Sequence, residues 1–119
     1  MTMRDINEAM LKRYPNLLSK YPHGVPFNMM GFPDFSRYAI RSVNIPNGFI
    51  SDNKDFTEAN KLAFGGNNRY KNSGNIIMNG QRYIWHHTEK NGKMQLIPYD
   101  IHDAVKHTGG AAVCGTRNR

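Results

Sequence analysis

Cysteine is almost absent from this chain. Cys114 is the single cysteine among 119 residues, so no internal disulfide can form and zinc fingers built on several cysteine ligands are excluded. No stretch approaches the roughly 18 consecutive apolar residues that a membrane helix needs, and the N-terminus lacks the apolar core of a signal peptide. We therefore expect no membrane partner, although a domain cut from a longer secreted protein need not carry its parent's export signal.

Acidic residues are scarce relative to basic ones. Nine Asp and Glu stand against sixteen Lys and Arg, which gives a formal net charge of +7 and an isoelectric point near 9.8. A surplus of positive charge attracts polyanions such as nucleic acid. Taken alone, the same surplus could equally serve solubility, so the charge becomes informative only together with the motifs below.

The order of local signals predicts a small α+β fold in one domain, residues 1–119. Residues 1–30 are expected to form a helical lead-in, which a capping box of Asp5 and Glu8 opens and which Pro15 bends or splits. The run of Pro, Gly and aromatic residues that follows is too aromatic for a disordered linker. It predicts an ordered loop with its rings packed on the core.

The middle of the chain predicts one strand and one helix. Residues 42–45 suit a short strand, and residues 46–48 (Pro-Asn-Gly) suit a turn. Asp55 with Glu58 repeats the capping-box spacing, and the helix that it opens would end at Gly65.

The final third predicts a strand, turn, strand and helix after a polar surface loop at residues 67–75. Residues 83–85 are aromatic or β-branched, Asn91-Gly92 is a favoured hairpin dipeptide, and residues 94–97 form the second strand. Asp100 is expected to cap the helix.

Four of the five histidines lie within residues 80–110, the predicted ββα unit: His86, His87, His102 and His107. Imidazole is the commonest metal ligand, and its unperturbed pKa of about 6.5 suits proton transfer near neutrality. Three imidazoles could hold a divalent ion while the fourth activates a water. Because successive strand residues point to opposite sides, His86 and His87 are expected to divide these tasks.

The spacing of His102 and His107 does not suit one regular helix. Five residues place two side chains about 140° apart at 3.6 residues per turn, too divergent for a shared ion. The glycines that follow at 109–110 allow the chain to unwind. We therefore expect the helix to end just before His107, which would turn back toward the metal.

The motif block resembles a known family. Trp85-His86-His87, then Met94-Gln95-Leu96-Ile97-Pro98, then His102 and the run from His107 through Thr108-Gly109-Gly110, resemble the WHH branch of the HNH/endonuclease VII superfamily. These are His-Me finger nucleases, found as C-terminal domains of bacterial polymorphic toxins. The resemblance spans roughly residues 30–110, and its fixed spacings are hard to meet by chance.

The resemblance implies a role for each residue that matches the motif. His87 would be the general base, and His86, His102 and His107 would be the metal ligands. Relatives place an Asn on the second strand to orient the base, and Gln95 stands nearest to that position here.

The implied activity is a metal-dependent endonuclease that hydrolyses phosphodiester bonds. Three imidazoles favour zinc or another transition metal, while nucleases of this architecture often tolerate magnesium. Members of the superfamily mostly cut duplexes, which implies DNA rather than RNA as the substrate. A secreted or delivered toxin acting in the cytoplasm of a target cell would have a cognate immunity protein, and a phage or mobile-element nuclease would share the chemistry.

A different class of function also fits the composition. A non-catalytic nucleic-acid-binding module could use the histidines for a structural metal site and its basic residues for phosphates. Such a module would bind nucleic acid and would not cleave it.

Overall fold

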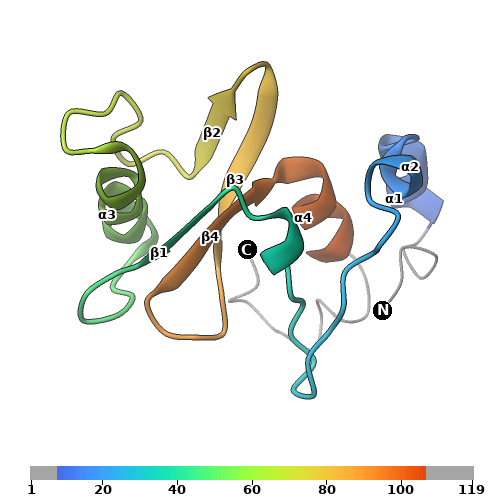
Figure 1. Cartoon of the computed structure of the whole chain (residues 1–119), viewed down its shortest axis with the longest axis horizontal. Helices are drawn as coiled ribbons and strands as arrows, with labels where there is room; N and C mark the ends of the chain where they lie inside the picture. Colours follow the sequence, from blue (N-terminus) through green and yellow to red (C-terminus); the bar gives the residue numbers. More distant parts are fainter. Residues whose placement is uncertain (1–7, 107–119) are drawn as a thin grey trace.

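The computed structural model describes residues 8–106 and shows a four-stranded antiparallel sheet with helices against both of its faces (Figure 1). The strands, in the spatial order β1-β4-β3-β2, are β1 (Arg41–Asn44), β4 (Lys93–Pro98), β3 (Gln81–His87) and β2 (Asn75–Met78). The helices are α1 (Glu8–Arg13), α2 (Leu17–Lys20), α3 (Asp52–Phe64) and α4 (Tyr99–Lys106), and a 3-10 turn, η2, covers Ser36–Tyr38. The predicted α+β class is confirmed, and none of the described helices is long and apolar enough to cross a membrane.

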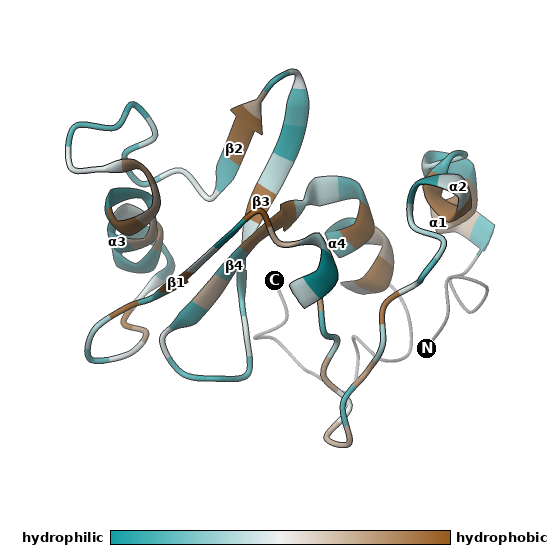
Figure 2. Cartoon of the chain, in the orientation of Figure 1, coloured by the Kyte–Doolittle hydropathy of each residue, from teal (hydrophilic) through white to brown (hydrophobic). Residues whose placement is uncertain are grey.

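The register of β3 against β4 gives the sheet two different faces. Trp85 pairs with Leu96 and belongs to the core under α3, whereas Ile84 pairs with Ile97 and packs in the core under α4. Helices α3 and α4 each carry both hydrophobic and hydrophilic residues, as expected for helices that cover a sheet on one side only (Figure 2). Alternate residues of β3 are therefore delivered to two separate cores.

Strands β3 and β4 and helix α4 form the predicted ββα unit. The hairpin turn at Asn91-Gly92 is confirmed, with Gly92 at φ 90°. The helix begins at Tyr99 directly after the last strand residue, Pro98. The predicted capping role of Asp100 is therefore wrong, because this residue already lies in the first helical turn.

The N-terminal lead-in is split in two at Pro15, one of the two outcomes expected, since α1 ends at Arg13 and α2 begins at Leu17. Asp5 of the predicted capping box lies outside the described residues. The two short helices pack against α4 (Figure 1).

Two carboxylates of α4 hold the lead-in. Each carboxylate accepts one hydrogen bond from a tyrosine hydroxyl and one from a basic side chain. Asp103 accepts from Tyr14 (2.8 Å) and Arg13 (2.9 Å), and Asp100 accepts from Tyr21 (2.6 Å) and Lys20 (2.6 Å). Burial and the acceptor carboxylate raise the pKa of both tyrosines well above the ordinary value. These contacts fix the helix that carries His102.

Strand β2 has no counterpart among the predicted elements, because residues 67–75 were expected to form a loop and residues 76–78 were given no structure. The strand pairs with β3 through a two-residue turn in which Asn79 and Gly80 have φ values of 52° and 75°. The aromatic loop before η2 is ordered as predicted, and Phe35 is its most deeply buried ring.

Candidate active site

His86 and His102, which we call the histidine pair, lie side by side between β3 and α4. Their ring centroids are 5.2 Å apart with an interplanar angle of 63°. The two side chains come from elements that the fold joins directly, because β4, which pairs with β3, runs straight into α4. The structure therefore brings together two of the three predicted metal ligands.

Phe35 covers the histidine pair. Its ring centroid lies 4.9 Å from that of His86 and 5.7 Å from that of His102. All three side chains are almost fully buried, at 1% exposure for Phe35, 3% for His86 and 1% for His102. The sequence pointed to ring packing by the aromatic loop but did not single out this ring as the cover of the site.

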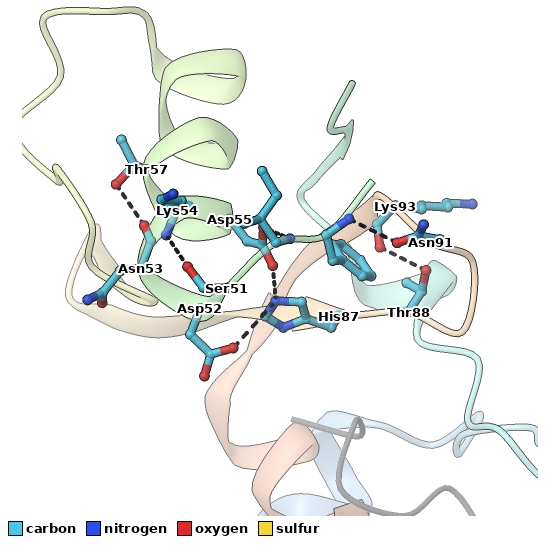
Figure 3. A network of polar contacts seen from close by, with 12 residues as sticks. Ser51, Asp52, Asn53, Lys54, Asp55, Thr57, His87, Thr88, Asn91 and Lys93 are labelled. Carbon is cyan, nitrogen blue, oxygen red and sulfur yellow. Dashed lines mark hydrogen bonds and ion pairs between the residues drawn. The ribbon is translucent and has the colours of Figure 1, made fainter. Parts of the chain in front are cut away.

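His87 lies on the opposite face of β3, toward α3 (Figure 3). Its Nε2 is 3.2 Å from Oδ2 of Asp55 and 3.8 Å from Oδ1 of Asp52. The rings of Phe49 and Phe56 pack on it with centroid distances of 4.7 and 5.5 Å. The two adjacent imidazoles thus occupy different environments, as the alternation of strand side chains requires.

Asp55 is available to His87 because another residue caps α3. The N-cap is Ser51, whose Oγ accepts from the backbone N–H of Lys54 at 3.3 Å. The predicted capping box that starts at Asp55 is therefore wrong, and the helix begins one turn earlier. Instead of capping the helix, Asp55 accepts from the backbone N–H of Ile50 through Oδ1 (2.9 Å) and contacts His87 through Oδ2.

Gln95 lies directly across from His86 in the β3–β4 register, on the face of the histidine pair. The residue across from His87 is Met94. The Gln95 amide donates to Oγ of Ser36 at 3.1 Å, which ties β4 to the turn η2.

Ser36 also contacts Asp34, two residues earlier in the chain. Hydrogen bonds from Ser36 lower the pKa of the Asp34 carboxyl, and the nearby charges of Lys93 and Lys90 lower it further. These residues and Gln95 line a small polar cavity of about 140 Å³. The cavity lies beside β4 and the loop before η2. It is not at the rings of the histidine pair, because neither His86 nor His102 lines it.

The indole of Trp85 anchors β3 to α3. Its Nε1 donates to Oδ1 of Asn60 at 2.7 Å, and the Asn60 amide in turn donates to the carbonyls of Lys71 and Ser73. Trp85 is fully buried, as a core ring that fixes the strand should be. This contact holds the α3 face of β3, where His87 also lies, in a fixed relation to the helix.

The remaining histidines differ in what the structure says of them. His107 lies outside the described residues, so its place relative to the histidine pair stays a prediction. His23 is exposed on the loop after α2, away from the predicted site. Within residues 8–106, no three His, Cys, Asp or Glu side chains are grouped closely enough to hold a metal ion.

The comparison with protein families finds a similarity that covers the ββα unit. Residues 78–117 match the WHH family, described as a nuclease of the HNH/ENDO VII superfamily with conserved WHH. The triplet of that name is Trp85-His86-His87, the end of β3. No curated protein and no solved structure gives a significant match to the chain. Residues 78–117, about a third of the chain, are thus similar to the WHH nucleases of the HNH/ENDO VII superfamily.

Proposed function

We propose that the protein is a metal-dependent endonuclease that hydrolyses phosphodiester bonds of DNA. The observation that carries this proposal is that the family match and the histidine pair fall in the same part of the chain. The segment that matches the nuclease family is the same ββα unit in which β3 and α4 bring His86 and His102 together. The lead-in helices donate hydrogen bonds to two carboxylates of α4. These contacts support the proposal of a single domain in which the lead-in (residues 1–30) stabilises the catalytic unit (residues 80–110).

The separation of the histidine pair fits two ligands of one ion. A zinc–nitrogen distance of about 2.1 Å, with about 1.1 Å more to the ring centre, puts each centroid about 3.2 Å from the metal. At a tetrahedral angle of about 109°, two such centroids are about 5.2 Å apart. The observed separation between His86 and His102 is 5.2 Å.

The proposed third ligand is His107. With three imidazoles the shell favours zinc or another transition metal, whereas two imidazoles completed by water or substrate oxygens would suit magnesium. Either shell keeps an open position for the substrate. The bound ion would polarise a non-bridging phosphate oxygen and stabilise the leaving 3′ oxygen.

The other side chains of the unit have roles of their own in this proposal. His87 is the general base that takes a proton from the attacking water, and it stands at the last residue of β3, where the strand ends. Gln95 lies on β4 across from His86, on the opposite face from His87, so we propose that it acts beside the histidine pair rather than by orienting His87. His86 and His102 hold the metal on the opposite face of the same strand.

Charge supports a nucleic-acid substrate. The net charge of +7 would attract the phosphate backbone and make binding weaken steeply with salt. We propose DNA rather than RNA, and equal amounts of labelled duplex DNA and RNA in one reaction would decide between them. Preferential loss of the RNA would overturn this choice.

We further propose that the nuclease acts as a delivered bacterial toxin with a cognate immunity protein as its partner. An acidic partner would complement the basic surface and shield it from DNA. Expression of the chain in bacterial cytoplasm should stop growth, and His87→Ala should relieve the arrest. Unimpaired growth with active, folded protein would contradict the toxin role while leaving the nuclease intact.

The direct test of the activity is cleavage of plasmid DNA by the purified protein. We expect nicking and linearisation with a divalent metal and none after EDTA is added. Full cleavage in excess EDTA would refute the metal mechanism. Binding without cleavage, across zinc, magnesium, manganese and nickel, would support the non-catalytic binding module instead.

Variants separate ligands from the base. His102→Ala and His86→Ala should weaken metal affinity in calorimetry, whereas His87→Ala should keep the metal and lose cleavage. His23→Ala, at an exposed histidine outside the site, is the matched control and should change neither. Loss of metal by His87→Ala with retention by His86→Ala would reverse the assignment within Trp85-His86-His87.

A further inference from the structure

A cavity of about 430 Å³ lies beside the second half of α3, where the loop of residues 65–74 leads from the helix to β2 (Figure 1). Its lining consists of polar residues and one glycine: Thr57, Lys61, Gly66, Asn68, Lys71 and Asn72. None of these described residues carries a carboxylate, and within residues 8–106 neither lysine forms an ion pair. Two ammonium groups with no acid between them suit an anion.

Lys71 has a backbone conformation that its residue type disfavours. Its φ is 51°, in the left-handed region, where the Cβ of an ordinary residue crowds the following carbonyl oxygen. The other described residues with positive φ are all glycine or asparagine, which tolerate this region. A residue that breaks a local rule of folding points to a function for its side chain.

Hydrogen bonds from two asparagines hold Lys71 in this conformation. Oδ1 of Asn68 accepts from the backbone N–H of Lys71 at 3.1 Å, and the buried amide of Asn60 donates to the Lys71 carbonyl at 2.9 Å. Asn60 also accepts from the indole of Trp85, so the loop is tied to both α3 and β3. The backbone that carries the Lys71 ammonium group is therefore fixed before a ligand binds, which lowers the entropic cost of binding.

We propose that Lys61 and Lys71 form a binding site for the phosphate backbone of duplex DNA, separate from the residues at which cleavage is proposed. The inference rests on the proposed function, because it names where the nuclease holds its substrate. Each ammonium group neutralises one phosphate and releases its counterions. Such contacts set the position of the duplex and read no bases, so the site favours no sequence.

The position of the site suits a substrate that extends from the ββα unit. The first turn of α3 lies against β3, where Asp55 contacts His87. Lys61 is six residues further along the helix, a rise of about 9 Å at 1.5 Å per residue. One DNA strand covers this distance in about three nucleotides, at about 3.4 Å of axis for each.

Two other cavities with lysines in their lining are less suited to a phosphate. The cavity beside β4 places two carboxylates, those of Asp34 and Glu89, among its lysines. In the cavity next to the first turn of α4, Lys20 already pairs with Asp100 at 2.6 Å. In both places an acid competes with the phosphate for the ammonium group.

The test compares Lys61→Gln and Lys71→Asn with the matched control Lys12→Gln. Each substitution removes one positive charge from an exposed lysine. Lys12, like Lys61, lies in the last turn of its helix, but α1 stands at the opposite end of the molecule from α3 (Figure 1). Fluorescence anisotropy measures the binding of a short labelled DNA duplex over a range of KCl concentrations. EDTA is present throughout, so that binding is measured without metal-dependent cleavage.

Loss of one phosphate contact should lower the slope of log affinity against log salt by about 0.9. Relative to binding at about 1 M KCl, this slope amounts to about an eightfold loss of affinity at about 0.1 M. We expect this loss for Lys61→Gln and for Lys71→Asn, and the product of both losses in the double variant. Lys12→Gln should stay within about twofold of wild type.

Thermal unfolding separates a binding role from a structural one. The chain already has asparagine at two other left-handed positions, Asn47 and Asn79. Lys71→Asn should therefore keep or raise Tm while it weakens binding, because asparagine relieves the backbone strain and removes the charge. A lysine kept for the fold of the loop would give the opposite result, a lower Tm.

The proposal would be overturned if Lys61→Gln and Lys71→Asn bound DNA as well as Lys12→Gln, if Lys71→Asn lowered Tm, or if the wild type did not bind the duplex. Plasmid cleavage by a wild type whose two variants bind normally would leave the proposed function intact without this site. Binding that depends on both lysines, with no cleavage under any metal, would support the site and refute the proposed function.

Discussion

Replacing Phe35 by Ala should destabilise the fold around the histidine pair without removing either of its proposed metal ligands. Phe35 is 1% exposed and packs on both rings of the histidine pair, His86 and His102. Truncating a fully buried Phe costs about 3–5 kcal/mol, from lost burial and from the cavity that remains. With an unfolding entropy of about 2.1 cal/mol/K per residue over roughly 100 ordered residues, Tm should fall by about 15–25 °C.

Phe32→Ala is the matched control, because it removes the same ring from the same loop at a half-buried position. It should cost roughly 1–2 kcal/mol, or about 5–10 °C in Tm. Thermal unfolding by circular dichroism measures both values. Added zinc should raise the Tm of the Phe32 variant more than that of the Phe35 variant, whose ligands have lost their support. Equal destabilisation by the two substitutions would refute the view that Phe35 covers the site.

Two further predictions concern the scaffold. Because burial and the acceptor carboxylates raise the pKa of Tyr14 and Tyr21 in the folded state, their stabilisation is complete below the unfolded value of about 10 and is lost as pH rises above it. Tyrosinate absorbance in an alkaline titration should show these two ionising last among the six tyrosines. The midpoint of urea unfolding should fall as pH rises in the alkaline range, and a midpoint that stays constant up to about pH 11 would contradict this. Gly92→Ala should destabilise by more than Gly80→Ala, since both have positive φ but only at Gly92 would the new Cβ meet a backbone oxygen, that of Ile45 at 2.9 Å; equal midpoints in denaturant would count against it.

The ββα unit was predictable because its signals are local. Asn91-Gly92 marks the hairpin, and apolar residues on both sides set the strands. The same kind of signal is present at Asn79-Gly80 after Ile76, Ile77 and Met78, and it could have revealed β2. A four-residue strand at the sheet edge, next to a polar loop, gives too short a pattern to stand out without that turn.

Helix starts were predicted less well than helices. For α3, both Ser51 and Asp55 are good capping residues, and the pattern alone favoured Asp55 because Glu58 stands three residues after it. For α4, Asp100 is a typical N-cap residue, yet the helix starts at Tyr99 and the carboxylate serves α2 instead. In both cases a long-range partner, which no local pattern contains, decides what the Asp side chain does.

The site itself was predictable only in part. The alternation along β3 was enough to foresee that His86 and His87 face different ways, and the ββα order placed His102 near His86. The contact of Asp55 with His87 spans 32 positions of sequence and depends on how α3 lies on the sheet. The cover that Phe35 provides depends in the same way on the path of the loop before η2.

We propose that His86 and His102 hold the ion on which DNA cleavage depends. The rate of cleavage as a function of metal concentration, measured side by side for wild type, His102→Ala and His23→Ala, tests this directly. We expect His102→Ala to need at least about tenfold more metal for its half-maximal rate, or to lose activity altogether, while His23→Ala follows the wild-type curve. A His102→Ala curve that coincides with the wild-type curve would show that His102 does not hold the ion.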